Sequence, residues 1–105
     1  MKDGFIRVAA ATPDIHVADP QYNSEQIIEL MEQGSARDVK VMVFPELCLT
    51  AYTCSDLFLQ ETLLKEAKNG LKRILQSSKS KDMVLFVGMP WMHKGKLYNV
   101  AAVVN

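Results

Sequence analysis

Short runs of apolar residues recur along the chain, and longer, more polar segments separate them. Four runs have the length and the β-branched or aromatic content of buried strands, and they occupy residues 5–12, 39–44, 83–89 and 97–104. Pro13, Pro45 and Pro90 directly follow the first three runs. Because proline cannot donate a hydrogen bond to a β-ladder, we expect each of these strands to end there.

Two of the intervening segments carry apolar residues at helical spacing. The first helix is predicted to begin with Asn23 as its N-cap and Gln26 as the capping-box partner, and to end near Arg37. The second is predicted to begin at the capping-box pattern of residues 53–56 and to continue to about Gln76. The predicted order is therefore β-α-β-α-β-β, an α/β fold with right-handed crossovers.

The last two predicted strands flank Lys94-Gly95-Lys96, a turn sequence that favours an antiparallel hairpin. All four strands are apolar on both faces over most of their length, so both faces of the sheet must be covered. Two helices could cover one face well or both faces thinly. The periodicity of the sequence does not decide between these arrangements.

Length and charge limit the class of protein. A chain of 105 residues is one domain at most, and its 49% hydrophobic content is ample for a core. The formal net charge is zero, which gives no electrostatic reason to expect nucleic acid or an anionic membrane as a partner. The basic residues of 65–81 are diluted by Glu61, Glu66 and Asp82, which indicates a solvated helix face.

The rest of the composition favours a cytoplasmic protein without a metal site. The polar start and the interruption of the first apolar run by Arg7 predict neither a signal peptide nor a membrane span. The spacing of Cys48 and Cys54 fits no zinc, redox or disulfide pattern, so we expect free thiols. His16 has no second ligand at metal-binding spacing, which predicts a surface role.

Glu46 is the candidate catalytic residue. It directly follows the predicted strand at 39–44 and Pro45, so it lies at the carboxyl end of an interior strand. In open α/β sheets ligands bind at that end, and a partly desolvated carboxylate there can act as a general base. The alternative is a solvated glutamate in a strand-to-helix loop, and spacing alone favours that alternative.

Two motifs around Glu46 carry a resemblance to a known family. Phe44-Pro45-Glu46-Leu47 followed by Leu49-Thr50-Ala51-Tyr52 resembles the first signature of the nitrilase (carbon–nitrogen hydrolase) superfamily. The longer run of residues 44–58 is similar to the amino-terminal glutaminase domain of glutamine-dependent NAD synthetases. Residues 87–90 and 97–101 resemble later strands of that domain. The family commonly has glycine where Ala51 stands, and often again at Ser55.

The resemblance implies an architecture that this chain fills only in part. The family fold is an α-β-β-α sandwich with helices outside and a second sheet packed against the first. Residues 1–105 would be the amino-terminal part of a single, incomplete glutaminase domain, which predicts a fragment with an apolar sheet face exposed when it is alone.

The resemblance also implies a mechanism. Amide hydrolysis in this family uses a cysteine nucleophile, a glutamate base and a lysine, and of these only Glu46 matches a position in this chain. Tyr52 matches a residue that lines the glutamine pocket, and a core tyrosine is an equal alternative. Cys48 is expected to pack as a small apolar residue, and catalysis by Cys54 is the less favoured reading because no His or Lys is near it in sequence.

As the resemblance implies it, the full enzyme would be a homo-oligomer that hydrolyses glutamine and passes ammonia to a synthetase domain of the same chain. That domain would amidate nicotinate adenine dinucleotide with ATP and magnesium, and no cofactor is expected in residues 1–105. Alternatives are another amidase of the superfamily acting on a different small amide, or a non-catalytic α/β domain. The isolated chain is predicted to be inactive, because the nucleophile and the lysine are missing.

Overall fold

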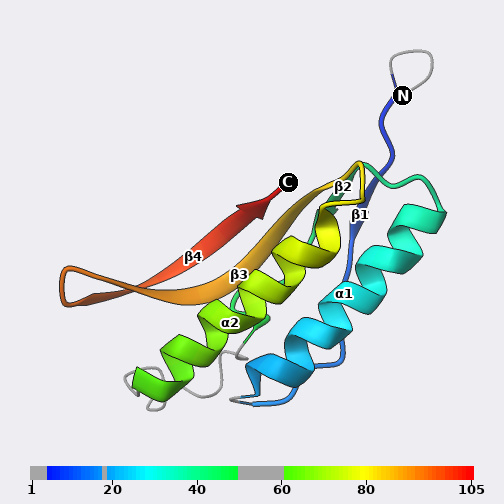
Figure 1. The fold of residues 1–105 in the computed structure, drawn as a ribbon. Helices are drawn as coiled ribbons and strands as arrows, with labels where there is room; N and C mark the ends of the chain where they lie inside the picture. Colours follow the sequence, from blue (N-terminus) through cyan, green and yellow to red (C-terminus); the bar gives the residue numbers. More distant parts are fainter. Residues whose placement is uncertain (1–4, 18, 50–60) are drawn as a thin grey trace.

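The computed structural model describes residues 5–17, 19–49 and 61–105 as a single sheet with two helices (Figure 1). The elements follow the order β1-α1-β2-α2-β3-β4. Their bounds are β1 Val8–Ala10, α1 Pro20–Ala36, β2 Val41–Val43, α2 Glu61–Ser78, β3 Val84–His93 and β4 Lys96–Val104. The predicted α/β class and element order are confirmed.

The strands lie side by side in the order β1-β2-β3-β4. β1 pairs parallel to β2, and β2 pairs parallel to β3, so α1 and α2 are crossover helices. β4 pairs antiparallel to β3 through the hairpin at Lys94 and Gly95. Both turn residues have positive φ, 49° and 78°, which is the conformation of a two-residue type I′ turn.

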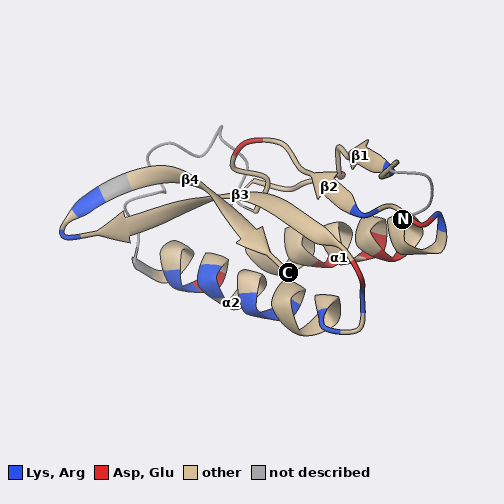
Figure 2. Cartoon of the chain, turned by 90° about the horizontal axis from the view of Figure 1, so that it is seen from above, with Lys and Arg blue, Asp and Glu red and all other residues tan. Residues whose placement is uncertain are grey.

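Both helices lie on the same face of the sheet (Figure 2). Alternate residues of β3 point toward them, so Leu85, Val87 and Met89 are fully buried in the core. α1 contributes Ile27 and Met31 to this core, and α2 contributes Ala67 and Ile74. The arrangement in which two helices cover one face is therefore the correct one.

The opposite face of the sheet is apolar and open in this chain. Val8, Val43 and Val103 are 66%, 46% and 63% exposed, and they belong to three different strands. Phe86 lies between the last two in the ladder, because it pairs with Val43 on one side and Val103 on the other. This is the face that the family resemblance assigns to a second sheet.

The first helix begins four residues earlier than predicted. Asp19 is the N-cap, and its Oδ1 accepts a hydrogen bond from the Tyr22 amide at 3.2 Å. Pro20 occupies the first turn, where a backbone N–H has no partner within the helix, so the missing N–H of proline costs no hydrogen bond. Asn23 is instead a fully buried residue inside the helix. The predicted end is confirmed, since Arg37 is the C-cap.

The first two strands are shorter than the apolar runs that predicted them. Two hydrogen bonds mark the ends of their ladder. At one end the Lys40 amide donates to the Arg7 carbonyl, and at the other the Ala11 amide donates to the Val43 carbonyl. At Phe44 the chain turns toward β3, so β1 loses its partner beyond Ala11. The predicted start of α2 at residues 53–56 lies outside the described residues, and the helix ends at Ser78, slightly beyond Gln76.

The expectation that Pro90 ends the third strand is wrong, because β3 continues to His93. The Phe86 and Gly88 carbonyls accept from Phe44 and Leu49, so the even-numbered residues of β3 direct their backbone groups away from β4. Pro90 follows the same alternation. Its missing N–H therefore removes no hydrogen bond from the β3–β4 ladder.

Candidate active site

Glu46 lies in the turn that immediately follows β2, at the carboxyl end of that parallel strand. The predicted placement at a strand end is confirmed, but the Glu46 side chain is exposed in this chain, so the expected partial desolvation is not seen. The next residue, Leu47, is buried and has a φ of 52°, the left-handed region that a bulky side chain rarely adopts. Such strain persists only where the surrounding structure holds it, and it often marks a functional segment.

Gly88 holds this turn against β3. The Leu49 amide donates to the Gly88 carbonyl at 3.2 Å, and the Cys48 thiol donates to the same oxygen at 3.6 Å. A Cβ at position 88 would lie 2.4 Å from the Leu47 nitrogen and 2.7 Å from the Pro45 oxygen. The turn can rest on the open face of β3 only because residue 88 has no side chain.

A hollow of about 430 Å³ lies beside the turn on the open face. Its polar side chains are those of Glu46 and Asn99, and Asn99 Nδ2 donates to Glu46 Oε1. Its other lining residues are glycine or apolar, namely Val43, Phe44, Phe86, Gly88, Val100 and Ala101. A carboxylate beside an apolar hollow at the end of a parallel strand can take a proton from a group placed in that hollow.

Asn23 ties together the segments that follow β1 and β2. Its Oδ1 accepts from the His16 amide at 2.7 Å, and its Nδ2 donates to the carbonyls of His16 and Leu49, each at 2.8 Å. One buried amide thus satisfies three backbone groups. Sequence reasoning missed this role, although the spacing of Asn23, Ile27 and Met31 places all three on one helix face.

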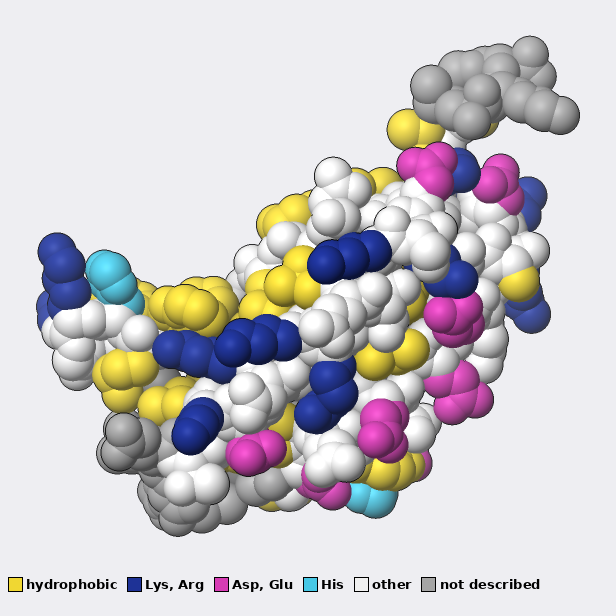
Figure 3. All heavy atoms as spheres, viewed as in Figure 1, with side chains coloured by type: hydrophobic (Ala, Val, Ile, Leu, Met, Phe, Trp, Pro, Cys, Tyr) yellow, Lys and Arg dark blue, Asp and Glu magenta, His cyan; other side chains and the backbone are white. Residues whose placement is uncertain are grey.

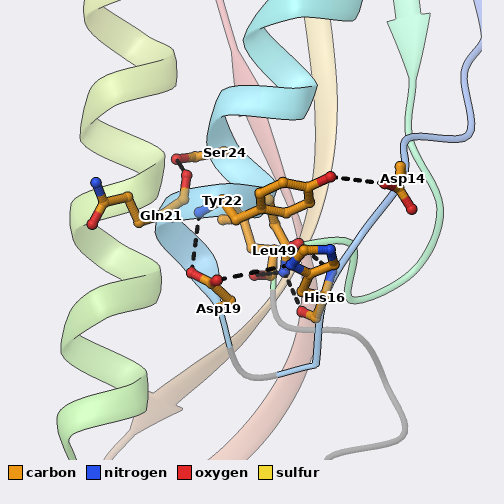
Figure 4. A network of polar contacts seen from close by, with 8 residues as sticks. Asp14, His16, Asp19, Gln21, Tyr22, Ser24 and Leu49 are labelled. Atoms are coloured by element: carbon orange, nitrogen blue, oxygen red, sulfur yellow. Dashed lines mark hydrogen bonds and ion pairs between the residues drawn. The ribbon is translucent and has the colours of Figure 1, made fainter.

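The predicted surface position of His16 is confirmed, since its side chain is about half exposed at 54%. Its ring stacks on Tyr22 with the centroids 3.6 Å apart. The Tyr22 hydroxyl donates to Asp14 Oδ2 at 2.7 Å, and this bond raises the pKa of Tyr22 above its ordinary value. These contacts fasten the segment before α1 to the helix (Figure 4).

Cys48 is buried and packs in the core, as predicted. Burial raises the pKa of its thiol from 9.0 to about 11. The thiolate needed for nucleophilic attack is therefore scarce at neutral pH. Burial and the raised pKa both favour the packing role predicted for Cys48.

The raised pKa makes Cys48 a source of pH-dependent stability. Between pH 9 and about 11 the folded chain keeps the thiol proton and the unfolded chain loses it. This stabilisation is complete below pH 9 and is lost as pH rises toward 11, by about 1.4 kcal/mol per pH unit. Urea unfolding of the chain and of Cys48→Ala at several pH values should show this difference in slope; equal slopes would contradict it.

Basic side chains gather over α2 on the face seen in Figure 3. Lys65, Lys68 and Lys72 are exposed there, which confirms the predicted solvated helix face. Two basic residues also serve packing: Lys68 Nζ lies 4.7 Å from the centroid of the Trp91 ring, and Arg73 donates to Ser24 Oγ at 2.9 Å. Lys94 and Lys96 are exposed around the hairpin turn.

Several sequence predictions fall on residues 50–60, outside the described part of the chain. They concern Tyr52, Cys54, the helix cap at Asp56 and the glycine departures at Ala51 and Ser55. Within the described residues, no helix combines the length and the apolar content that crossing a membrane requires. The same residues contain no cluster of three or more His, Cys, Asp or Glu side chains placed to hold a metal ion.

Comparison with known proteins places this geometry in a family. The sequence profile of the carbon-nitrogen hydrolase family matches residues 7–105. The glutamine-dependent NAD(+) synthetase of Mycobacterium leprae is 34% identical over 102 residues, which are 97% of this chain and 15% of that protein.

Solved structures agree with the fold. The crystal structure of a glutamine-dependent NAD(+) synthetase from Cytophaga hutchinsonii matches with a TM-score of 0.87 and 29% identity, over 94% of this chain and 17% of that one. An amidase from Nesterenkonia sp. matches with a TM-score of 0.82 and 17% identity, over 98% of this chain and 39% of that one, and this likeness shows the fold alone. The chain spans less than a fifth of either synthetase.

Proposed function

Because the chain belongs to the carbon-nitrogen hydrolase family, we propose that it is part of the glutamine amidohydrolase domain of a glutamine-dependent NAD synthetase. The observation that carries this proposal is the position of Glu46. Its carboxylate lies at the end of β2 beside an apolar hollow. The turn that carries it packs against Gly88 and contains Leu47, whose backbone is in the left-handed region. The names of the relatives support glutamine as the amide.

In the proposed reaction Glu46 is the general base. It takes the proton from a cysteine thiol supplied by another part of the full-length protein, and the thiolate attacks the amide carbon of glutamine. A lysine from the same source stabilises the oxyanion that forms. The protonated Glu46 then gives its proton to the departing ammonia, and water hydrolyses the thioester to glutamate.

The remainder of the proposal concerns the full-length protein. The ammonia passes to a synthetase domain of the same chain, which uses ATP and magnesium to amidate nicotinate adenine dinucleotide. Tyr52 forms a wall of the glutamine pocket, and the full enzyme is a homo-oligomer. Residues 1–105 contribute the base and part of the pocket, and they bind neither the nucleotide nor the metal.

Replacing Glu46 with glutamine tests this proposal in the full-length protein. We expect glutamine-dependent NAD formation to fall at least about 100-fold, because the amide cannot accept the thiol proton. NAD formation from ammonium ions should persist, because it bypasses glutamine hydrolysis. Release of glutamate and formation of NAD are measured separately with each nitrogen source.

Two comparisons sharpen this test. Glu25→Gln, an exposed glutamate of α1, is the matched control and should leave both reactions unchanged. Residues 1–105 produced alone should release no ammonia from glutamine. Full glutamine turnover by Glu46→Gln would refute the assignment, and hydrolysis of another amide without NAD formation would favour a different amidase of the family.

A further inference from the structure

Asn99 contacts the proposed base directly, since its Nδ2 donates to Glu46 Oε1. The two residues are 53 positions apart in the sequence: Glu46 lies in the turn after β2, and Asn99 lies within β4. Of the described residues that line the hollow, Glu46 is the one with an ionisable side chain, and Asn99 is its neutral neighbour.

The sheet register explains how this contact forms. Asn99 pairs with Pro90 in the antiparallel ladder, and Ala101 pairs with Gly88. Asn99 and Ala101 therefore point to the same, open face of the sheet. Because Gly88 has no side chain, the turn that carries Glu46 rests on that face and lies within reach of Asn99.

We propose that Asn99 is a positioning residue for the Glu46 carboxylate, an inference that rests on the function proposed above. The Asn99 amide group can donate a hydrogen bond to Oε1 but cannot give up a proton at neutral pH. It therefore fixes the orientation of the carboxylate without competing for its chemistry. Oε2 is then the oxygen that accepts the thiol proton.

A merely structural role explains the contact less well. β4 is already held to β3 by a continuous ladder, which begins at the pair Leu85–Val104 and ends at the pair His93–Lys96. The turn that carries Glu46 is held by the backbone bond from Leu49 to Gly88. Neither β4 nor the turn needs the Asn99 side chain to hold its position. A Glu46 carboxylate that rotates freely, in contrast, would not stay oriented toward the thiol.

Asn99→Ala in the full-length protein tests the positioning role. We expect kcat for glutamine hydrolysis to fall about 10- to 100-fold, because the carboxylate is no longer oriented. KM for glutamine should change less than about twofold, because the base does not hold the bound amide in the ground state. NAD formation from ammonium ions should equal that of the unsubstituted protein.

Asn99→Asp tests the pH–rate profile, which a purely structural role of Asn99 would leave unchanged. The substitution keeps the size of the side chain but places a second carboxylate against Glu46, and two such groups share a proton. The acid limb of the pH–rate profile for glutamine hydrolysis should shift to higher pH by about 1–2 units. The profile for NAD formation from ammonium ions should not shift.

The results separate this inference from the proposed function. If Glu46→Gln is fully active with glutamine, the proposed function fails, and the role of Asn99 fails with it. If Glu46→Gln is inactive while both Asn99 variants keep the kcat and the pH profile of the unsubstituted protein, only the positioning role fails. Parallel loss of the ammonium-dependent reaction in both Asn99 variants would show a structural role and would also overturn the inference.

Discussion

Replacing Gly88 with alanine should destabilise the protein by at least about 3 kcal/mol. The added Cβ would lie 2.4 Å from the Leu47 nitrogen, 2.7 Å from the Pro45 oxygen and 2.9 Å from the carbonyl carbon of Glu46. All three atoms belong to the backbone, so no side-chain rotation can relieve the overlap. The turn must move off β3, and it then loses the hydrogen bond from Leu49 to the Gly88 carbonyl.

Urea unfolding followed by circular dichroism measures this loss, and Gly34→Ala is the matched control. Gly34 is also buried, but the atom that its Cβ would meet at 2.3 Å is the terminal methyl of Met42, which can rotate away. Alanine also favours the helix at that position by about 1 kcal/mol. Equal destabilisation by both substitutions would show that the fit between the turn and β3 is not the cause.

Replacing Asn23 with leucine should cost about 4 kcal/mol of unfolding free energy. The apolar side chain has a similar size, but it leaves the His16 amide and the carbonyls of His16 and Leu49 without their partner. Each such group costs about 1–3 kcal/mol when it is left unpaired away from water. The segments after β1 and β2 would then separate, because the amide that joins them is absent.

The neighbouring residue provides the control for Asn23. Ser24 is equally buried; its Oγ donates to the Gln21 carbonyl of its own helix and accepts from Arg73, each at 2.9 Å, and the half-buried Arg73 can turn toward water when the hydroxyl is removed. Ser24→Ala should therefore cost only about 1 kcal/mol. Thermal and urea unfolding of both variants test the difference. A loss of unfolding free energy at position 23 no larger than at position 24 would contradict the role of Asn23 in joining the segments after β1 and β2.

Local signals in the sequence were enough to predict the frame of the fold. A β-branched run ending at Pro45 correctly placed Glu46 after an interior strand, and Gly95 correctly placed the hairpin. The start of α1 was wrong because Asp19 and Asn23 are both good capping residues. The choice between them depends on the bond from Asn23 to Leu49, which lies 26 residues further along the chain.

Of the candidate site, only the position of Glu46 was predictable. Glu46 follows from the strand-end rule and the family resemblance, but the partner that orients it does not. Asn99 stands in an apolar strand, and no spacing rule connects it to a residue 53 positions away. Gly88 is likewise one glycine in an apolar run until the register shows which turn lies over it. Such contacts are set by the packing of strands and not by their periodicity.

Pro90 also has a consequence for association between chains. An exposed strand edge with regular N–H and C=O groups is a template on which another chain can add a strand and begin to aggregate. On the side of β3 that faces away from β4, position 90 lacks the N–H that such a ladder would need. The same proline that leaves the hairpin intact therefore interrupts any ladder along this side of β3, and the exposed charges of Lys94 and Lys96 at the tip also disfavour strand pairing between chains.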